Sequence, residues 1–121
     1  MPLVSTASLV AEAVARGRAV AAFNVITLEH AEAIAAGAEQ ADRPAILQIS
    51  HNAVRFHGAL APIAAGAAAV ARSARMPLAL HLDHVEDEAL LHQAADTGFS
   101  SAMFDAGALP YDENVRATAA A

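Results

Sequence analysis

The sequence predicts an α/β fold built around a parallel β-sheet. Four short apolar runs alternate with longer segments of helical periodicity, which is the pattern of consecutive βαβ units. Most residues of these runs are apolar, without regular alternation of polar residues, as expected for parallel strands covered on both faces. Two architectures fit these observations, an open doubly wound sheet and part of an eight-stranded barrel. The first crossover lacks the glycine pattern of a dinucleotide site, which weakens the doubly wound alternative.

The expected strands are defined by apolar runs that end at polar residues. Pro44 and Pro77 open the second and third strands, and the strands are expected at residues 19–23, 45–49, 78–82 and 100–104. Each run is short enough for a strand and too short for a typical helix.

The expected helices are longer and carry recognisable ends. Ser5 or Thr6 can cap the first helix, Gly17 can end it, and Pro62 is tolerated in the first turn of the third helix. The helices are expected at residues 6–15, 28–41, 60–74 and 86–97, with a last one capped by Asp112.

Composition excludes several functional classes. The chain has 121 residues, 56% of them hydrophobic and 17% charged, which indicates a packed core rather than disorder. The net charge of −6 argues against nucleic-acid binding, and the absence of cysteine excludes disulfides. There is no lysine, so a Schiff-base mechanism has no support. No signal peptide or membrane-spanning run is evident, so a cytoplasmic protein without membrane association is expected.

Polar residues follow each of the four expected strands. These residues are Asn24, Ser50, Asp83 with His84, and Asp105. Ligands of parallel α/β folds bind at the carboxyl ends of strands, so four strands that deliver polar groups to one edge would build one site. The alternative is that Asn, Ser and Asp are common turn and cap residues.

The segment His81-Leu82-Asp83-His84 is the sharpest chemical pattern. Alternation along a strand places His81 and Asp83 on one face, with His84 near the turn. Imidazole is a common metal ligand and a neighbouring carboxylate can transfer protons. The remaining histidines are interpreted as follows: His30 and His92 as helix surface or packing residues, His51 and His57 as members of a solvated loop.

Several segments together resemble the class II (metal-dependent) fructose-bisphosphate aldolases in order and spacing. They are Ala22-Phe23-Asn24-Val25, residues 44–50, residues 77–84, Gly98 to Asp105, and Leu109 to Val115. The family includes fructose- and tagatose-bisphosphate aldolases. Val85 and the pair Ala106-Gly107 depart from residues common in the family.

The resemblance implies a (β/α)8 TIM barrel, of which residues 1–121 supply about the first four β/α units as an incomplete domain. It implies zinc or another divalent metal, and a second metal or monovalent cation. By position, Asp83 matches the catalytic acid/base, His84 a zinc ligand and Asp105 a carboxylate near the second metal. Asn24 and Ser50 match substrate-binding residues. His81 belongs to the motif and is expected to support the residues that contact the metal and the substrate, without contacting either itself.

The expected activity is reversible cleavage of fructose 1,6-bisphosphate by a homodimer or homotetramer of the full-length form. Two further histidine ligands are expected beyond Ala121, so this segment alone should be inactive. Alternatives are another ketose-bisphosphate aldolase or a metal-dependent isomerase, and a non-catalytic half-barrel that serves binding or assembly.

Overall fold

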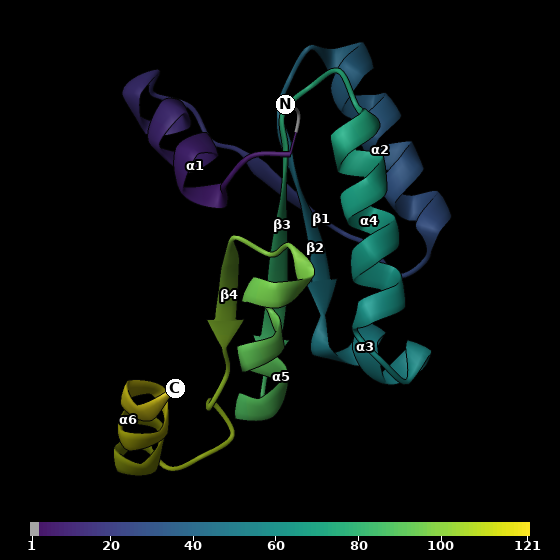
Figure 1. The fold of residues 1–121 in the computed structure, drawn as a ribbon. Helices are drawn as coiled ribbons and strands as arrows, with labels where there is room; N and C mark the ends of the chain where they lie inside the picture. Colours follow the sequence, from purple (N-terminus) through teal and green to yellow (C-terminus); the bar gives the residue numbers. More distant parts are fainter. Residues whose placement is uncertain (1–2) are drawn as a thin grey trace.

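The computed structural model describes residues 3–121 as a four-stranded parallel sheet with helices (Figure 1). The strands lie in the order β1-β2-β3-β4, and they are β1 (Ala21–Asn24), β2 (Ala45–Ser50), β3 (Leu78–Val85) and β4 (Ser101–Phe104). The predicted α/β class with parallel strands is confirmed. Each strand lies beside the one before it in the sequence, without the reversal of order that marks a doubly wound sheet.

Helices precede the first strand, connect the strands and follow the last strand. They are α1 (Thr6–Ala15), α2 (Leu28–Ala41), α3 (His51–His57), α4 (Ala61–Ser73), α5 (Glu88–Gln93) and α6 (Tyr111–Ala120), with a 3-10 helix η1 (Ala95–Thr97). Among these residues no single helix is long and apolar enough to cross a membrane. Helices α3 and α4 reach that length only as a pair, which is bent by 114° between them.

The main core lies between the sheet and helices α2 and α4. Side chains on one face of β2 and β3 are fully buried there: Leu47, Ile49, Leu78, Leu80 and Leu82. The helices contribute mostly alanines, which allow the two helices to approach the sheet and each other closely. Burial of each such Leu or Ile stabilises the fold by about 1.5–3 kcal/mol.

Helix α1 lies on the opposite side of the sheet from α2 and α4 (Figure 1). Its one buried residue, Leu9, packs against Ile46 and Ala79, which point away from the main core. Leu3 and Val4 also contact β3, and Val4 N–H donates to the Leu78 carbonyl at 2.9 Å. Helix α1 therefore covers the amino-terminal end of this second face, which we call the inner face.

The structure differs from the sequence prediction in three helices. Residues 51–57, expected as a solvated loop, form helix α3, which Ser50 caps and Gly58 ends in a left-handed conformation. The expected helix 86–97 is shorter and divides into α5 and η1. The last helix begins at Tyr111 after Pro110, so Asp112 lies in its first turn and does not cap it.

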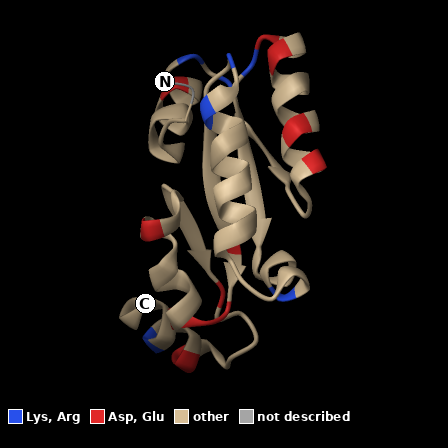
Figure 2. Cartoon of the chain, turned by 45° about the vertical axis from the view of Figure 1, so that its right-hand side comes forward, with Lys and Arg blue, Asp and Glu red and all other residues tan. Residues whose placement is uncertain are grey.

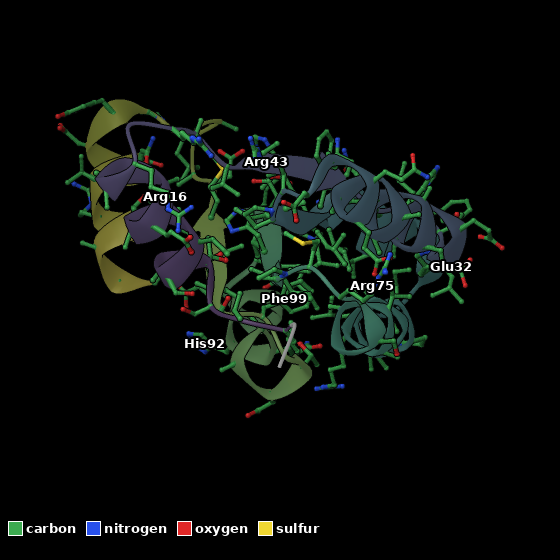
Figure 3. All side chains as sticks on the ribbon, turned by 90° about the horizontal axis from the view of Figure 1, so that it is seen from above. Arg16, Glu32, Arg43, Arg75, His92 and Phe99 are labelled. Carbon is green, nitrogen blue, oxygen red and sulfur yellow. The ribbon has the colours of Figure 1, made fainter. Side chains whose placement is uncertain are left out.

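Helices α2 and α4 are held together at one end by an ion pair. Glu39 on α2 accepts from the backbone N–H of Arg75 at 2.7 Å, and its other oxygen lies 3.1 Å from Arg75 Nη2. Figure 3 shows Arg75 between the two helices. These bonds lower the pKa of Glu39, first through the backbone N–H and then through the guanidinium.

Candidate active site at the carboxyl ends of the strands

Polar residues form a layer across all four strands on the inner face. Strand pairing aligns Asn24 with Gln48, Gln48 with His81, and His81 with Ser101. Residues aligned in neighbouring parallel strands point to the same face. One step closer to the carboxyl ends, Ser50 is aligned with Asp83. The inner face is thus apolar under α1 and polar toward the carboxyl ends, where Figure 2 shows acidic segments.

Asp83 is the central residue of this polar region and the one buried charged side chain among residues 3–121. One carboxylate oxygen lies 3.4 Å from His81 Nε2 and the other lies 3.6 Å from His84 Nε2. The carboxylate is therefore placed between two imidazole rings. A carboxylate held in this way can accept and return a proton at a fixed position.

His84 occupies an irregular position at the end of β3. Its φ angle is 50°, in the left-handed region, and the pairing between β3 and β4 shifts between Leu82 and Val85. Non-glycine residues rarely adopt this conformation. The irregularity interrupts the alternation of the strand, so the exposed His84 ring lies beside Asp83 at the edge of the sheet.

Asp105 follows β4 and binds His84. His84 Nδ1 lies 2.8 Å from Asp105 Oδ2, while Asp105 Oδ1 accepts from the Gly107 N–H at 2.9 Å. The hydrogen bond to Asp105, and then the charge of Asp83, raise the pKa of His84. The hydrogen bonds from His84 and Gly107 lower the pKa of Asp105. The structure therefore brings Asp83, His84 and Asp105 together at one edge of the sheet.

Asn24 and Ser50 lie at the same edge but are bound within the protein. Asn24 Oδ1 accepts from Gln48 Nε2 at 2.9 Å, which leaves the Asn24 amide N–H groups available. Ser50 Oγ accepts from the Ala53 N–H at 3.1 Å and so caps α3, while its hydroxyl hydrogen remains available to donate. Ser50 therefore acts as a helix cap, which was the alternative to a role in the site.

Sequence reasoning missed two members of the polar layer, Gln48 and Ser101. His81 Nδ1 lies 2.7 Å from Ser101 Oγ, so Ser101 is a direct partner of the motif histidine. Gln48 is the polar residue inside an otherwise apolar strand, and this interruption was the signal in the sequence. The pairing of Ser101 with His81 depends on the register of β3 and β4, which cannot be inferred from the sequence.

Helix α3 joins the loops around the site. The Glu86 N–H donates to His51 Nδ1 at 3.1 Å, and Arg55 Nη2 lies 2.9 Å from Glu86 Oε2. His57 Nε2 contacts the Ile26 carbonyl. The reading of His51 and His57 as members of a solvated loop was wrong, and Glu86 pairs with Arg55, whereas Asp87 caps α5.

The donors for a metal are incomplete in residues 3–121. In this range no three His, Cys, Asp or Glu side chains come close enough to hold a metal ion together. The carboxyl edge offers the exposed imidazole of His84, with the carboxylates Asp83 and Asp105 beside it. Tetrahedral zinc in a catalytic site takes three protein ligands, so this segment fits part of such a site and no more.

Comparison with known proteins identifies the family. A family model described as fructose-bisphosphate aldolase class-II matches residues 4–121. The chain belongs to this family. The fructose-bisphosphate aldolase of Treponema pallidum is 41% identical over 117 residues, a match that covers 93% of this chain and 35% of that protein. The fructose-bisphosphate aldolase of Geobacillus stearothermophilus is 37% identical over 120 residues, covering 98% of this chain and 42% of that protein.

Solved class II aldolase structures place the sheet in a larger barrel. The YdjI aldolase from Escherichia coli K12 superposes with a TM-score of 0.82 at 27% identity, and the match covers 94% of this chain and 44% of that one. The class II aldolase chain described here therefore spans less than half of the relatives that it matches. Its four-stranded sheet is a partial TIM barrel, which confirms the predicted fold.

Proposed function

We propose that these residues are the amino-terminal half of the barrel domain of a metal-dependent aldolase that reversibly cleaves fructose 1,6-bisphosphate to glycerone phosphate and glyceraldehyde 3-phosphate. The observation that supports this most is the position of Asp83 between His81 and His84 at the carboxyl edge. The names of the related proteins support the substrate.

In this proposal Asp83 takes the proton from the C4 hydroxyl during cleavage and returns it in the reverse reaction. The carboxylate is largely shielded from water and held on both sides, which fixes the position of the proton acceptor. His81 lies two residues earlier on the same strand, where it supports Asp83 and does not contact the substrate. Asn24 and Ser50 would contact the substrate through the hydrogen atoms that their internal bonds leave available.

His84 would provide one metal ligand, with the remaining histidine ligands outside this sequence. When bound, zinc or another divalent cation supplies a Lewis acid that polarises the C2 carbonyl. Binding would require the His84 ring to be released from at least one of its carboxylate partners, since its Nδ1 is bound to Asp105. If the bond between His84 and Asp105 were the one released, Asp105 would be free for a second metal or a monovalent cation.

The test is cleavage of the sugar bisphosphate by the longest natural chain that contains these residues. We expect Asp83→Asn to lower kcat by about 10²–10⁴-fold, because it removes the proton acceptor but keeps the shape. Asp112→Asn, a carboxylate on α6 away from this cluster, is the matched control. Equal activity of Asp83→Asn and the unaltered protein would contradict the proposal. Faster cleavage of tagatose than of fructose bisphosphate would assign the other ketose.

Residues 1–121 alone should have no aldolase activity, since no three His, Cys, Asp or Glu side chains among residues 3–121 lie close enough to hold a metal ion. The measurement is cleavage by the purified segment after addition of zinc. Turnover comparable to that of a full-length class II aldolase would show that the segment carries a complete site.

The cellular setting follows from the same proposal. We infer a cytoplasmic enzyme of sugar-phosphate metabolism, without a nucleic-acid or membrane partner, that forms a homodimer or homotetramer in the full-length form. The excess of acidic residues supports the absence of nucleic-acid binding.

A further inference from the structure

Helix α1 is joined to β4 by side-chain hydrogen bonds at its first residue. The Thr6 N–H donates to Ser100 Oγ at 2.9 Å, and Ser101 Oγ donates to Thr6 Oγ1 at 2.7 Å. Thr6 is not needed to cap its own helix, because Ser5 Oγ already accepts from the Ser8 N–H. The Thr6 hydroxyl is therefore directed to the sheet and not to the helix terminus.

The contact between Thr6 and Ser101 determines how Ser101 meets His81. A serine hydroxyl has one hydrogen to donate and can also accept. Since Ser101 donates this hydrogen to Thr6, it must accept a hydrogen bond from His81 Nδ1, which lies 2.7 Å away. Nδ1 of His81 therefore carries a hydrogen, and the ring is held by a short bond on the side away from Asp83.

The fixed ring in turn restricts the position of the Asp83 carboxylate. With Nδ1 bound to Ser101, the other nitrogen of His81 faces the Asp83 carboxylate at 3.4 Å. The same row of contacts thus runs from α1 through β4 and β3 to the buried carboxylate, and Thr6, Ser101 and His81 are all shielded in part from solvent.

We propose that Thr6 and Ser101 are positioning residues for the catalytic carboxylate, acting through the ring of His81. This inference rests on the role proposed above for Asp83. It gives α1, which covers the amino-terminal end of the inner face and lies far from Asp83 in the sequence, a part in the chemistry of the site. Small displacements of a reacting group can cost up to about 10²-fold in rate.

The test compares hydroxyl deletions in the longest natural chain. Thr6→Val keeps the shape of the side chain and removes the acceptor, Thr6→Ser keeps the acceptor, and Ser101→Ala removes the bridge. Ser8→Ala is the matched control, because the Ser8 hydroxyl donates only to the carbonyl of Ser5, the residue that caps the same helix. We expect Thr6→Val and Ser101→Ala to lower kcat by about 10-fold with KM within about 2-fold, and Thr6→Ser and Ser8→Ala to retain kcat.

A second measurement reports on the ring without activity. In ¹⁵N-histidine NMR spectra we expect a protected N–H signal from His81 Nδ1, assigned by its loss in His81→Gln. This signal should be lost or shifted in Thr6→Val and Ser101→Ala and kept in Ser8→Ala. Unchanged spectra and unchanged kcat in Thr6→Val would overturn the inference while leaving the aldolase proposal intact. Full activity of Asp83→Asn would instead overturn the proposed function and, with it, the catalytic consequence of this contact.

Discussion

At the scale of single residues, the backbone of His84 is as informative as its side chain. A φ of 50° is unfavourable for a residue with a Cβ. His84 adopts it at the point where the pairing between β3 and β4 shifts. The irregularity brings the ring next to Asp83 and Asp105 instead of turning it to the helix side of the sheet. The expected metal ligand is therefore placed by local strain.

This strain predicts that glycine at position 84 is more stabilising than alanine, the reverse of the order in helix interiors. We expect His84→Gly to unfold with a free energy about 1 kcal/mol larger than His84→Ala, because glycine adopts the left-handed region freely. Urea denaturation of both metal-free variants would measure the difference. In helix interiors the order is the opposite, so a more stable alanine variant would show that the position is not strained.

The cap at Ser50 predicts a loss of stability that is separate from any loss of activity. Ser50→Ala should lower the free energy of unfolding by about 1 kcal/mol, since the Ala53 N–H loses its acceptor. Ser50→Thr should keep the cap and most of the stability. If Ser50→Ala unfolds like the unaltered chain but loses substrate affinity, the hydroxyl serves the ligand alone.

The cluster of Asp83, His84 and Asp105 could be predicted from sequence because each residue ends a recognisable apolar run. The contacts of Ser101 with Thr6 and with His81 could not. They join residues 95 and 20 positions apart, and depend on the strand register and on where α1 packs. Periodicity indicates which face a side chain occupies but not which residue it meets on the next element.

At the scale of elements, strands and long helices were predicted well and short helices poorly. The apolar residues on both sides of Gln48 identify β2 in the sequence. Helix α3 has only seven residues and little periodicity. Its only signals are Ser50 before it and Gly58 after it. Tertiary contacts to Ile26 and Glu86 stabilise a helix of a length that is marginal in isolation.

Two glycines in helices differ in the space that is available for an added methyl group. A Cβ at Gly37 on α2 would meet nothing within 4 Å, and one at Gly66 on α4 would lie 3.1 Å from Leu28 Cδ1. We expect Gly37→Ala to stabilise the protein by up to about 1 kcal/mol through helix propensity. Gly66→Ala should gain less, because Leu28 must move. Thermal unfolding of both variants tests this, and a larger gain for Gly66→Ala would contradict the packing.

The ion pair between Glu39 and Arg75 predicts a pH-dependent contribution to stability. Because folding lowers the pKa of Glu39 below 4.5, its contribution is present above that pH and is lost as the pH falls through the folded value. Glu39→Gln should therefore be less stable than the unaltered protein at neutral pH, and the difference should disappear in acid. Glu32→Gln, exposed on the same helix, is the control. A constant difference across this range would exclude the carboxylate as the cause.

At the scale of the molecule, both outer strands of the sheet lack a neighbour on one side among residues 3–121. All four residues of β1 are exposed, and Phe23 and Met103 remain 50% and 39% exposed on the two outer strands. Such edges promote association with other chains. In the related barrels further strands follow, and the match covers 44% of one such chain.

These edges predict self-association of residues 1–121 when studied alone. Sedimentation should show species larger than a monomer that increase with concentration, and Phe23→Lys should shift them toward the monomer. Val14→Lys also replaces an exposed apolar side chain, but on α1, and should change the degree of association little. A cooperatively folding monomer at all concentrations would contradict this expectation.

The bonds between Thr6 and the start of β4 also bear on the folding pathway. They join residues 94 and 95 positions apart, nearly the whole described chain, so their formation requires the closure of a very long loop. The β2–β3 pairs close much shorter loops and can form earlier. Helix α1 is therefore expected to dock in the last step, and Thr6→Val should accelerate unfolding while leaving the refolding rate unchanged.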